Sequence, residues 1–311
     1  MPAKEAGGAK KSAGAKKKSA GAKKKAAAAK EPATGTRPSR AQRAEAKRRD
    51  RIKKMRSRAG SRYRVHYDID GPRVRLGIAW FAGAMVALAL GVPGVALYFG
   101  VTFAAAGAHA LRTWRARGAD VDPRDALIGV AVVIAAAAVH PRAMGVALWL
   151  LAAGAIALAV RRGARGMRPA VAASSLLLQC ALPTAVAGGC LVLLADLEIW
   201  SAIALVLLAS AYETGDYLIG SGATNSVEGP VAGGVAVAVV ALAVAALGFP
   251  PFSVGEAALF GIAVGPGAFA GQMLASVVLP HARAFAPALR RVDSLLIVAP
   301  LWYLGISGFV V

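Results

Sequence analysis

The sequence predicts an all-α polytopic membrane protein of about nine transmembrane helices, preceded by a disordered basic N-terminal tail. Residues 65–311 are rich in Ala, Val, Leu and Gly and contain a succession of uninterrupted apolar runs. Runs of about 18 or more apolar residues can cross a bilayer as a helix, and a soluble core could bury one such run but not a succession of them. Positive charge is also segregated along the chain, because no lysine follows Lys54.

The tail, residues 1–64, holds 23 Lys and Arg against 4 acidic residues. Its segment Ser12–Lys18 repeats almost at once as Ser19–Lys25. Such low-complexity sequence has too few apolar groups to form a core, so we expect it to be disordered. Lysine runs bind phosphate groups without sequence preference, which predicts non-specific contact with an anionic membrane surface or with RNA.

The second part, residues 65–311, is predicted to be a multi-pass membrane domain. Pro93, Pro183 and Pro266 are expected to end or bend helices within it. The expected spans cover roughly residues 74–91, 93–111, 126–139, 143–160, 170–194, 197–212, 228–248, 254–279 and 293–310.

The loops between the spans predict the orientation in the membrane. Arginine-rich loops follow the second, fourth and eighth spans, whereas the alternate loops are poor in positive charge. Because positively charged loops stay in the cytoplasm, we expect a cytoplasmic N-terminus, and an odd number of spans then places Val311 outside. The predicted location is the cell membrane.

Three polar segments interrupt the apolar pattern at the expected cytoplasmic ends of the spans, at residues 212–217, 225–234 and 290–294. Converging carboxylates at that depth could hold Mg²⁺, which prefers a few carboxylates together with phosphate oxygens of a substrate. Adjacent arginines suit phosphate recognition. Ionisable groups in such positions are costly and usually serve a function.

The order and spacing of these segments resemble the CDP-diacylglycerol synthase (phosphatidate cytidylyltransferase) family. That family has an Asp-Thr/Ser-Gly-x-Tyr element, then Lys-Thr-x-Glu-Gly-x-x-x-Gly-Gly, and finally Leu-Asp-Arg-x-Asp-Ser. The matching segments here are Glu213–Tyr217, Ser226–Gly229 with Gly233-Gly234, and Leu289–Ser294. The architecture is similar over roughly residues 75–311, and the specific motifs lie within 212–294.

The resemblance implies an enzyme of phospholipid biosynthesis, a nucleotidyltransferase that moves CMP from CTP to phosphatidate. The reaction would depend on Mg²⁺ and take place at the cytoplasmic face. The residues that it points to are Glu228, Asp293 and Arg291 for catalysis, Ser226, Arg290 and Ser294 for binding the nucleotide, and Glu213, Asp216 and Asp293 for the metal.

The chain also departs from the family pattern. Ala268, Gly271 and Arg290 stand where the family has carboxylates, and Ala275-Ser276 stands in place of a Lys-Arg pair. An alternative hypothesis is therefore a catalytically inactive relative that binds a lipid or nucleotide or acts as a scaffold. A small-solute transporter is a further alternative that rests only on the number of spans and the Gly/Pro-interrupted helices, and a homodimer is left open.

Each candidate residue also has a structural interpretation. Asp293 and Arg291 could form an ion pair at the interface, and Glu228 could be a helix N-terminal carboxylate stabilised by the macrodipole. Glu213 and Asp216 could be wet loop residues. Two cysteines lie ten residues apart in one apolar run, which indicates small core residues and no disulfide between them.

Overall fold

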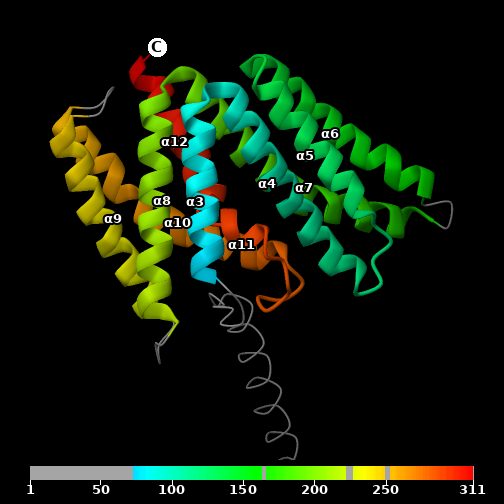
Figure 1. The fold of residues 1–311 in the computed structure, drawn as a ribbon. Helices are drawn as coiled ribbons and strands as arrows, with labels where there is room; N and C mark the ends of the chain where they lie inside the picture. The colour runs from blue at the N-terminus through cyan, green and yellow to red at the C-terminus, as the bar shows by residue number, and fades with distance from the viewer. Residues whose placement is uncertain (1–72, 163–165, 222–226, 249–252, 311) are drawn as a thin grey trace, which may run out of the picture. The chain divides into compact units, whose positions relative to one another are not determined.

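The computed structural model describes residues 73–162, 166–221, 227–248 and 253–310, which all belong to one compact unit. Every regular element in these ranges is a helix, in agreement with the predicted fold class. The predicted tail and the predicted site residue Ser226 lie outside the described ranges. The helices are α3 (Arg73–Ala89), α4 (Gly91–Arg115), α5 (Pro123–Ala137), α6 (Pro141–Arg162), α7 (Met167–Leu197), α8 (Ile199–Gly220), α9 (Glu228–Leu247), α10 (Val254–Val278), α11 (Leu289–Val292) and α12 (Leu295–Val310) (Figure 1).

The longer helices coincide with the predicted spans to within a few residues, with one exception. The sixth span was predicted to end at residue 212, but α8 continues to Gly220. The prediction is wrong there because it followed hydropathy, and Glu213 and Asp216 interrupt the apolar run. A helix needs its backbone hydrogen bonds and a buried face rather than unbroken hydropathy, and Asp216 lies on the buried face of α8.

Six helices in the described ranges are long and apolar enough to cross a membrane: α4, α6, α7, α8, α9 and α10. The chain is therefore described as a multi-pass helical membrane protein. The helices α3, α5 and α12 are shorter, with 17, 15 and 16 residues. Nine crossings thus stay a prediction, as does the orientation of the two termini.

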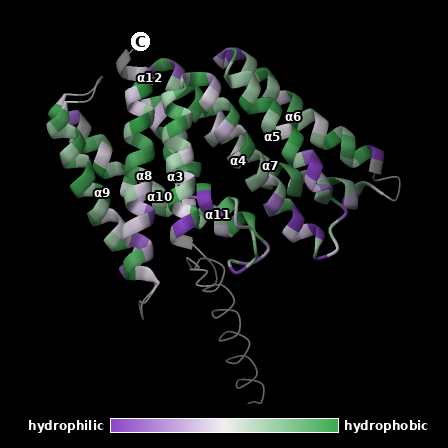
Figure 2. Cartoon of the chain, viewed as in Figure 1, coloured by the Kyte–Doolittle hydropathy of each residue, from purple (hydrophilic) through white to green (hydrophobic). Residues whose placement is uncertain are grey.

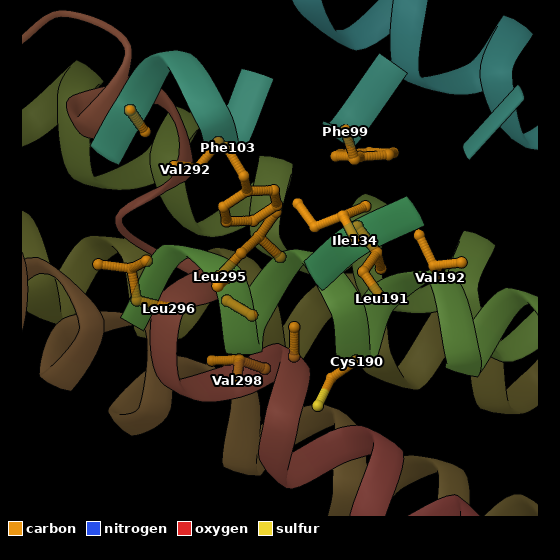
Figure 3. Packing of buried hydrophobic residues seen from close by; sticks show 14 of the residues in the cluster. Phe99, Phe103, Ile134, Cys190, Leu191, Val192, Val292, Leu295, Leu296 and Val298 are labelled. Atoms are coloured by element: carbon orange, nitrogen blue, oxygen red, sulfur yellow. The ribbon is translucent and has the colours of Figure 1, made fainter. Parts of the chain in front are cut away.

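The core lies around α7, which packs against α4, α5, α6 and α12. Phe99, Phe103, Ile134 and Leu191 are fully or almost fully buried there (Figure 3). Close approach depends on Gly188, because a β-carbon at that position would meet the side chains of Ile134 and Phe103. Small residues at such contacts are typical of helices that pack within a membrane.

A second set of contacts joins α8, α9 and α10. Gly215 of α8 lies against the backbone carbonyl of Ala232, and Gly233 of α9 lies against the ring of Tyr212. Gly234 has open space around the position of its own β-carbon, but its Cα would lie 3.3 Å from a β-carbon at Gly265 of α10. These glycines allow the half of α8 that carries Glu213 and Asp216 to pack closely against α9.

Hydrophilic residues gather near α11 and at the adjacent ends of α3 and α8, while the shafts of α6 and α9 are largely hydrophobic (Figure 2). The same region holds the short helix α11 and the turn that leads into α12. The polar segments singled out in the sequence therefore fall largely at one end of the helices.

Candidate functional site

A buried polar cluster forms where the C-terminal half of α8 meets α10 and the junction of α11 with α12. We call it the carboxylate cluster, and it comprises Glu213, Asp216, Gln272, Ser276, Arg290, Asp293 and Ser294. Asp216, Gln272, Ser276, Asp293 and Ser294 are all buried. Buried polar groups are stable only when they are hydrogen-bonded, and each carboxylate here accepts from a different donor.

The first link joins α12 to α8. The Ser294 hydroxyl donates to Oε1 of Glu213 at 2.6 Å, although the two residues are 81 positions apart. Ser294 is fully buried, and Glu213 is half-buried. This bond connects the first and the last of the predicted motifs.

The second link is a chain of three side chains between α8 and α10. Nε2 of Gln272 donates to Oδ2 of Asp216 at 3.0 Å, and the Tyr212 hydroxyl donates to Oε1 of Gln272 at 3.3 Å. Tyr212 and Asp216 are four residues apart on α8, so both face α10. The side-chain amide of Gln272 therefore donates to the Asp216 carboxylate and accepts from the Tyr212 hydroxyl, both on α8.

The third link is the ion pair of Arg290 with Asp293, in which Nη1 donates to Oδ2 at 3.4 Å. The guanidinium has two further acceptors, the Ser276 hydroxyl at 3.3 Å and the backbone carbonyl of Ala282 at 2.8 Å. The side chain of Arg290 is only 15% exposed. Three acceptors from separate parts of the chain hold this cation in a defined position.

Arg291, the next residue of α11, also lies near the cluster. A β-carbon at Gly77 of α3 would lie 3.4 Å from Nη1 of Arg291, so the start of α3 lies against this guanidinium. The positive charge of Arg291 attracts the carboxylate of Glu213, and the negative charges of Asp293 and Asp216 repel it. Such interactions are strong because few water molecules screen charges in a buried site.

The predicted metal ligands Glu213, Asp216 and Asp293 thus belong to one electrostatic cluster. Their oxygen donors are of the type that Mg²⁺ prefers. Within the described ranges, however, no three His, Cys, Asp or Glu side chains are spaced as ligands of one ion. The donor set fits the chemistry of Mg²⁺, and its binding stays a prediction.

Glu228 does not share this burial. It is the first residue of α9 and is exposed, whereas Asp216 and Asp293 are 3% and 5% exposed. A carboxylate in the first turn of a helix is stabilised by the helix macrodipole, in line with the structural interpretation. Asp293, Arg290, Ser294, Glu213 and Asp216 are therefore brought together, while Glu228 lies at the surface.

Sequence reasoning missed the roles of Gln272 and Ser276. Both are polar residues in an otherwise apolar helix, α10, and polar side chains in membrane helices usually face a partner within the bundle. That signal was present in the sequence. Their partners Asp216 and Arg290 were not predictable, because they come from α8 and α11.

The departures from the family pattern are linked to one another by packing. A β-carbon at Gly271 would overlap the backbone carbonyl oxygen of Asp293, so a carboxylate side chain has no room there while α11 and α12 hold this position. Ser276, in place of a basic residue, accepts from Arg290, which stands in place of an acidic one.

A comparison of the chain with protein-family models and with curated proteins finds no match.

Proposed function

We propose that the chain is a divergent phosphatidate cytidylyltransferase that makes CDP-diacylglycerol from CTP and phosphatidate. The observation that carries this proposal is the bond from Ser294 to Glu213, which joins two motifs that resemble that family although they are 81 residues apart. The buried pair of Arg290 and Asp293 in the same cluster adds a phosphate-binding cation and a carboxylate.

In the proposed reaction a phosphate oxygen of phosphatidate attacks the α-phosphorus of CTP, and pyrophosphate leaves. Arg290 and Arg291 would bind and orient the two phosphate groups, as arginine forks do with phosphate oxygens. Glu213, Asp216 and Asp293 would offer oxygen donors to Mg²⁺, and phosphate oxygens of the substrates would complete its ligands, since no three side chains are spaced around one ion in the described ranges. The ion would supply positive charge to the phosphate oxygens when bound. Burial of the cluster excludes water from the reacting groups.

The charges of the cluster support the need for a divalent cation. Three carboxylates and two guanidiniums leave one negative charge in excess when all are ionised. One bound Mg²⁺ would turn this excess into a positive charge. Catalysis of phosphoryl-group transfer requires positive charge beside the phosphates, because negative charge develops on their oxygens in the transition state.

The test is the release of pyrophosphate by the purified full-length chain in detergent, with CTP, Mg²⁺ and phosphatidate. We expect turnover that needs all three components and that falls by about a hundredfold or more in Asp293→Asn. Asp196→Asn is the matched control, because Asp196 is an exposed carboxylate near the end of α7, and it should keep its turnover. Glu228→Gln measures the predicted role of the exposed carboxylate separately.

A wild-type protein that is folded and monodisperse but releases no pyrophosphate would reject the transferase. Equal turnover of Asp293→Asn and the wild type would reject the proposed site.

A second candidate function is binding of a phosphate-bearing lipid or nucleotide without transfer. It is favoured by Gly271, which leaves no room for a carboxylate where the resembled family has one, so that the cluster has fewer side chains to hold a catalytic metal. Saturable binding of phosphatidate or CTP without pyrophosphate release would distinguish this function from the first.

A further inference from the structure

Three basic side chains gather where the end of α4 meets the connection between α10 and α11. Arg117 follows α4, and His281 and Arg283 belong to the connection. The positive charges of Arg117 and Arg283 both act on the imidazole of His281, which places the three side chains near one another. Both guanidiniums are on exposed residues, and His281 is half-buried. We call these three residues the basic patch.

The positive charge of the basic patch is not offset by an ion pair. Neither Arg117 nor Arg283 pairs with an acidic side chain among the described residues. The connection between α10 and α11 contains no Asp or Glu. After α4, Asp122 pairs with Arg115 at 3.9 Å, and Asp120 lines a recess between α4, α5, α6 and α7. Like charges held together repel one another, so a bound anion would be stabilised between them.

The backbone that carries the basic patch is held in place by the helices around it. Ala282 and Ala286 are each 2% exposed, so the connection is anchored on both sides of Arg283. Nε1 of Trp114 donates to the backbone carbonyl of Val278 at 2.9 Å, which fixes the end of α4 against the end of α10. The patch begins three residues after each partner of this bond. The basic side chains therefore project from a fixed part of the fold.

The basic patch lies where a bilayer would have its headgroups. The candidate membrane-spanning helices α4 and α10 end at Arg115 and Val278, a few residues before the patch. Phe285, two residues after Arg283, is 77% exposed. An apolar ring beside cations suits the boundary of a bilayer, because the ring can enter the apolar layer while the cations reach phosphate groups. A free phosphate ion would contact the cations and leave the ring in water.

We infer that the basic patch binds the phosphate group of an anionic phospholipid from the surrounding bilayer, with Phe285 against the apolar part of the lipid. Guanidinium groups donate to phosphate oxygens in a bidentate manner, and a phospholipid brings phosphate and hydrocarbon to the same boundary. The basic patch shares no residue with the carboxylate cluster. The inference therefore does not depend on the proposed function, and either can fail without the other.

The test is a titration of the purified full-length chain with phosphatidylglycerol in phosphatidylcholine micelles, in which native mass spectrometry counts the bound anionic lipids. The site variant combines Arg117→Gln with Arg283→Gln. The matched control combines Arg124→Gln with Arg168→Gln, which removes the same charge from exposed arginines at the starts of α5 and α7. We expect the site variant to bind about tenfold more weakly, as for the loss of two cations at an anionic surface, and the control to bind like the wild type. The lysine-rich tail is the same in all three proteins, so it does not affect the comparison.

An NMR titration of His281 reports binding at the basic patch itself. Phosphatidylglycerol should raise the pKa of His281 in the wild type and in the control variant, because a bound phosphate group offsets the positive charges beside the imidazole. The rise should be smaller in the site variant, which has lost the two guanidiniums that hold the phosphate. A general weakening of the fold would not produce this difference.

Equal affinities of the site and control variants, or an equal rise in the pKa of His281 in both, would overturn the inference. Inorganic phosphate and CTP, added separately at matched ionic strength, test the soluble sources of a phosphate group. Neither should displace phosphatidylglycerol from the wild type. Displacement by either one would assign the basic patch to a soluble anion and reject the lipid.

Discussion

At the scale of single residues, the carboxylate cluster depends on side chains that serve two partners at once. Gln272 donates to Asp216 and accepts from Tyr212, which neither a carboxylate nor an apolar residue can do in the same place. Gly271, its neighbour, contributes by having no side chain. Adjacent positions on α10 therefore provide a polar bridge and a close backbone contact.

Replacing Gln272 by Leu removes the amide donor to Asp216 within a buried site. We expect Gln272→Leu to lower the free energy of unfolding by about 1–3 kcal/mol, the cost of taking a hydrogen-bond partner from a buried polar group. Tyr212→Phe is the control, since it removes one hydroxyl bond and leaves the donor to Asp216 in place. Reversible denaturation in mixed micelles measures both, and an equal loss in the two variants would contradict the assigned role of the amide.

Replacing Gly271 by Ala tests the close contact of α10 with Asp293. The added methyl group would overlap a backbone carbonyl, which cannot rotate away as a side chain can, so we expect a loss of about 1–3 kcal/mol in the free energy of unfolding. Gly154→Ala is the matched control, because the position of a β-carbon there is open and lies inside α6. Alanine favours a helix interior over glycine, so the control should be stabilised by about 0.5–1 kcal/mol. A stabilised Gly271→Ala would show that α11 and α12 lie farther away.

At the scale of elements, the end of α10, which leads into the segment between α10 and α11, is tied to α4 and α7. Nε1 of Trp114 donates to the carbonyl of Val278 at 2.9 Å, and Nε2 of Gln179 donates to that of Val277 at 3.1 Å. These bonds occupy carbonyls at the end of α10, which have no partner within the helix itself. They also set where the chain turns back towards α11 and hence where Arg290 enters the cluster.

His281 lies in this segment, outside the candidate spans. Burial, followed by the positive charges of Arg117 and Arg283, lowers the pKa of His281 below its ordinary value of about 6.5. The folded state therefore favours neutral His281, and this contribution to stability is present above about pH 6.5 and is lost as the pH falls towards the lowered value.

An NMR titration of His281 in Arg117→Gln checks this cause. Removing the guanidinium should raise the pKa of His281, whereas Arg124→Gln, a control at the start of α5, should leave it unchanged. A pKa that shifts equally in the two variants would show that Arg117 does not act on His281 directly.

At the scale of the whole molecule, the described helices divide into an apolar shaft and polar ends. Exposed apolar residues such as Trp149 of α6, which is 79% exposed, suit the interior of a bilayer. Arginines are concentrated around the connections that follow α4, α6 and α10, many of them in the flanking ends of the helices. This distribution predicts that those connections face the cytoplasm.

The orientation can be tested with a membrane-impermeant thiol reagent on intact cells and on inverted vesicles. We expect Arg117→Cys and Phe285→Cys to react only in inverted vesicles, and Val139→Cys, in the connection between α5 and α6, to react only in cells. The native Cys180 and Cys190 are buried and free, so they should remain unlabelled in the folded protein. Labelling of Arg117→Cys and Val139→Cys from the same side would refute the predicted crossing of α5.

The sequence by itself determined the class of the molecule and the positions of its helices, because the length and hydropathy of a segment decide whether it can cross a bilayer. It also identified Glu213, Asp216, Arg290, Asp293 and Ser294 as candidates, since ionisable and polar groups at that depth are costly.

Only the tertiary structure decided which of these residues meet. The bond from Ser294 to Glu213 and the bridge through Gln272 depend on how α8, α10 and α12 pack, and that packing depends on backbone contacts at glycines such as Gly271. The same packing buries Asp293 and leaves Glu228 exposed, which the sequence could not distinguish. A local pattern reports what each segment can do, but contacts between segments far apart in the chain follow from the close packing of the whole bundle.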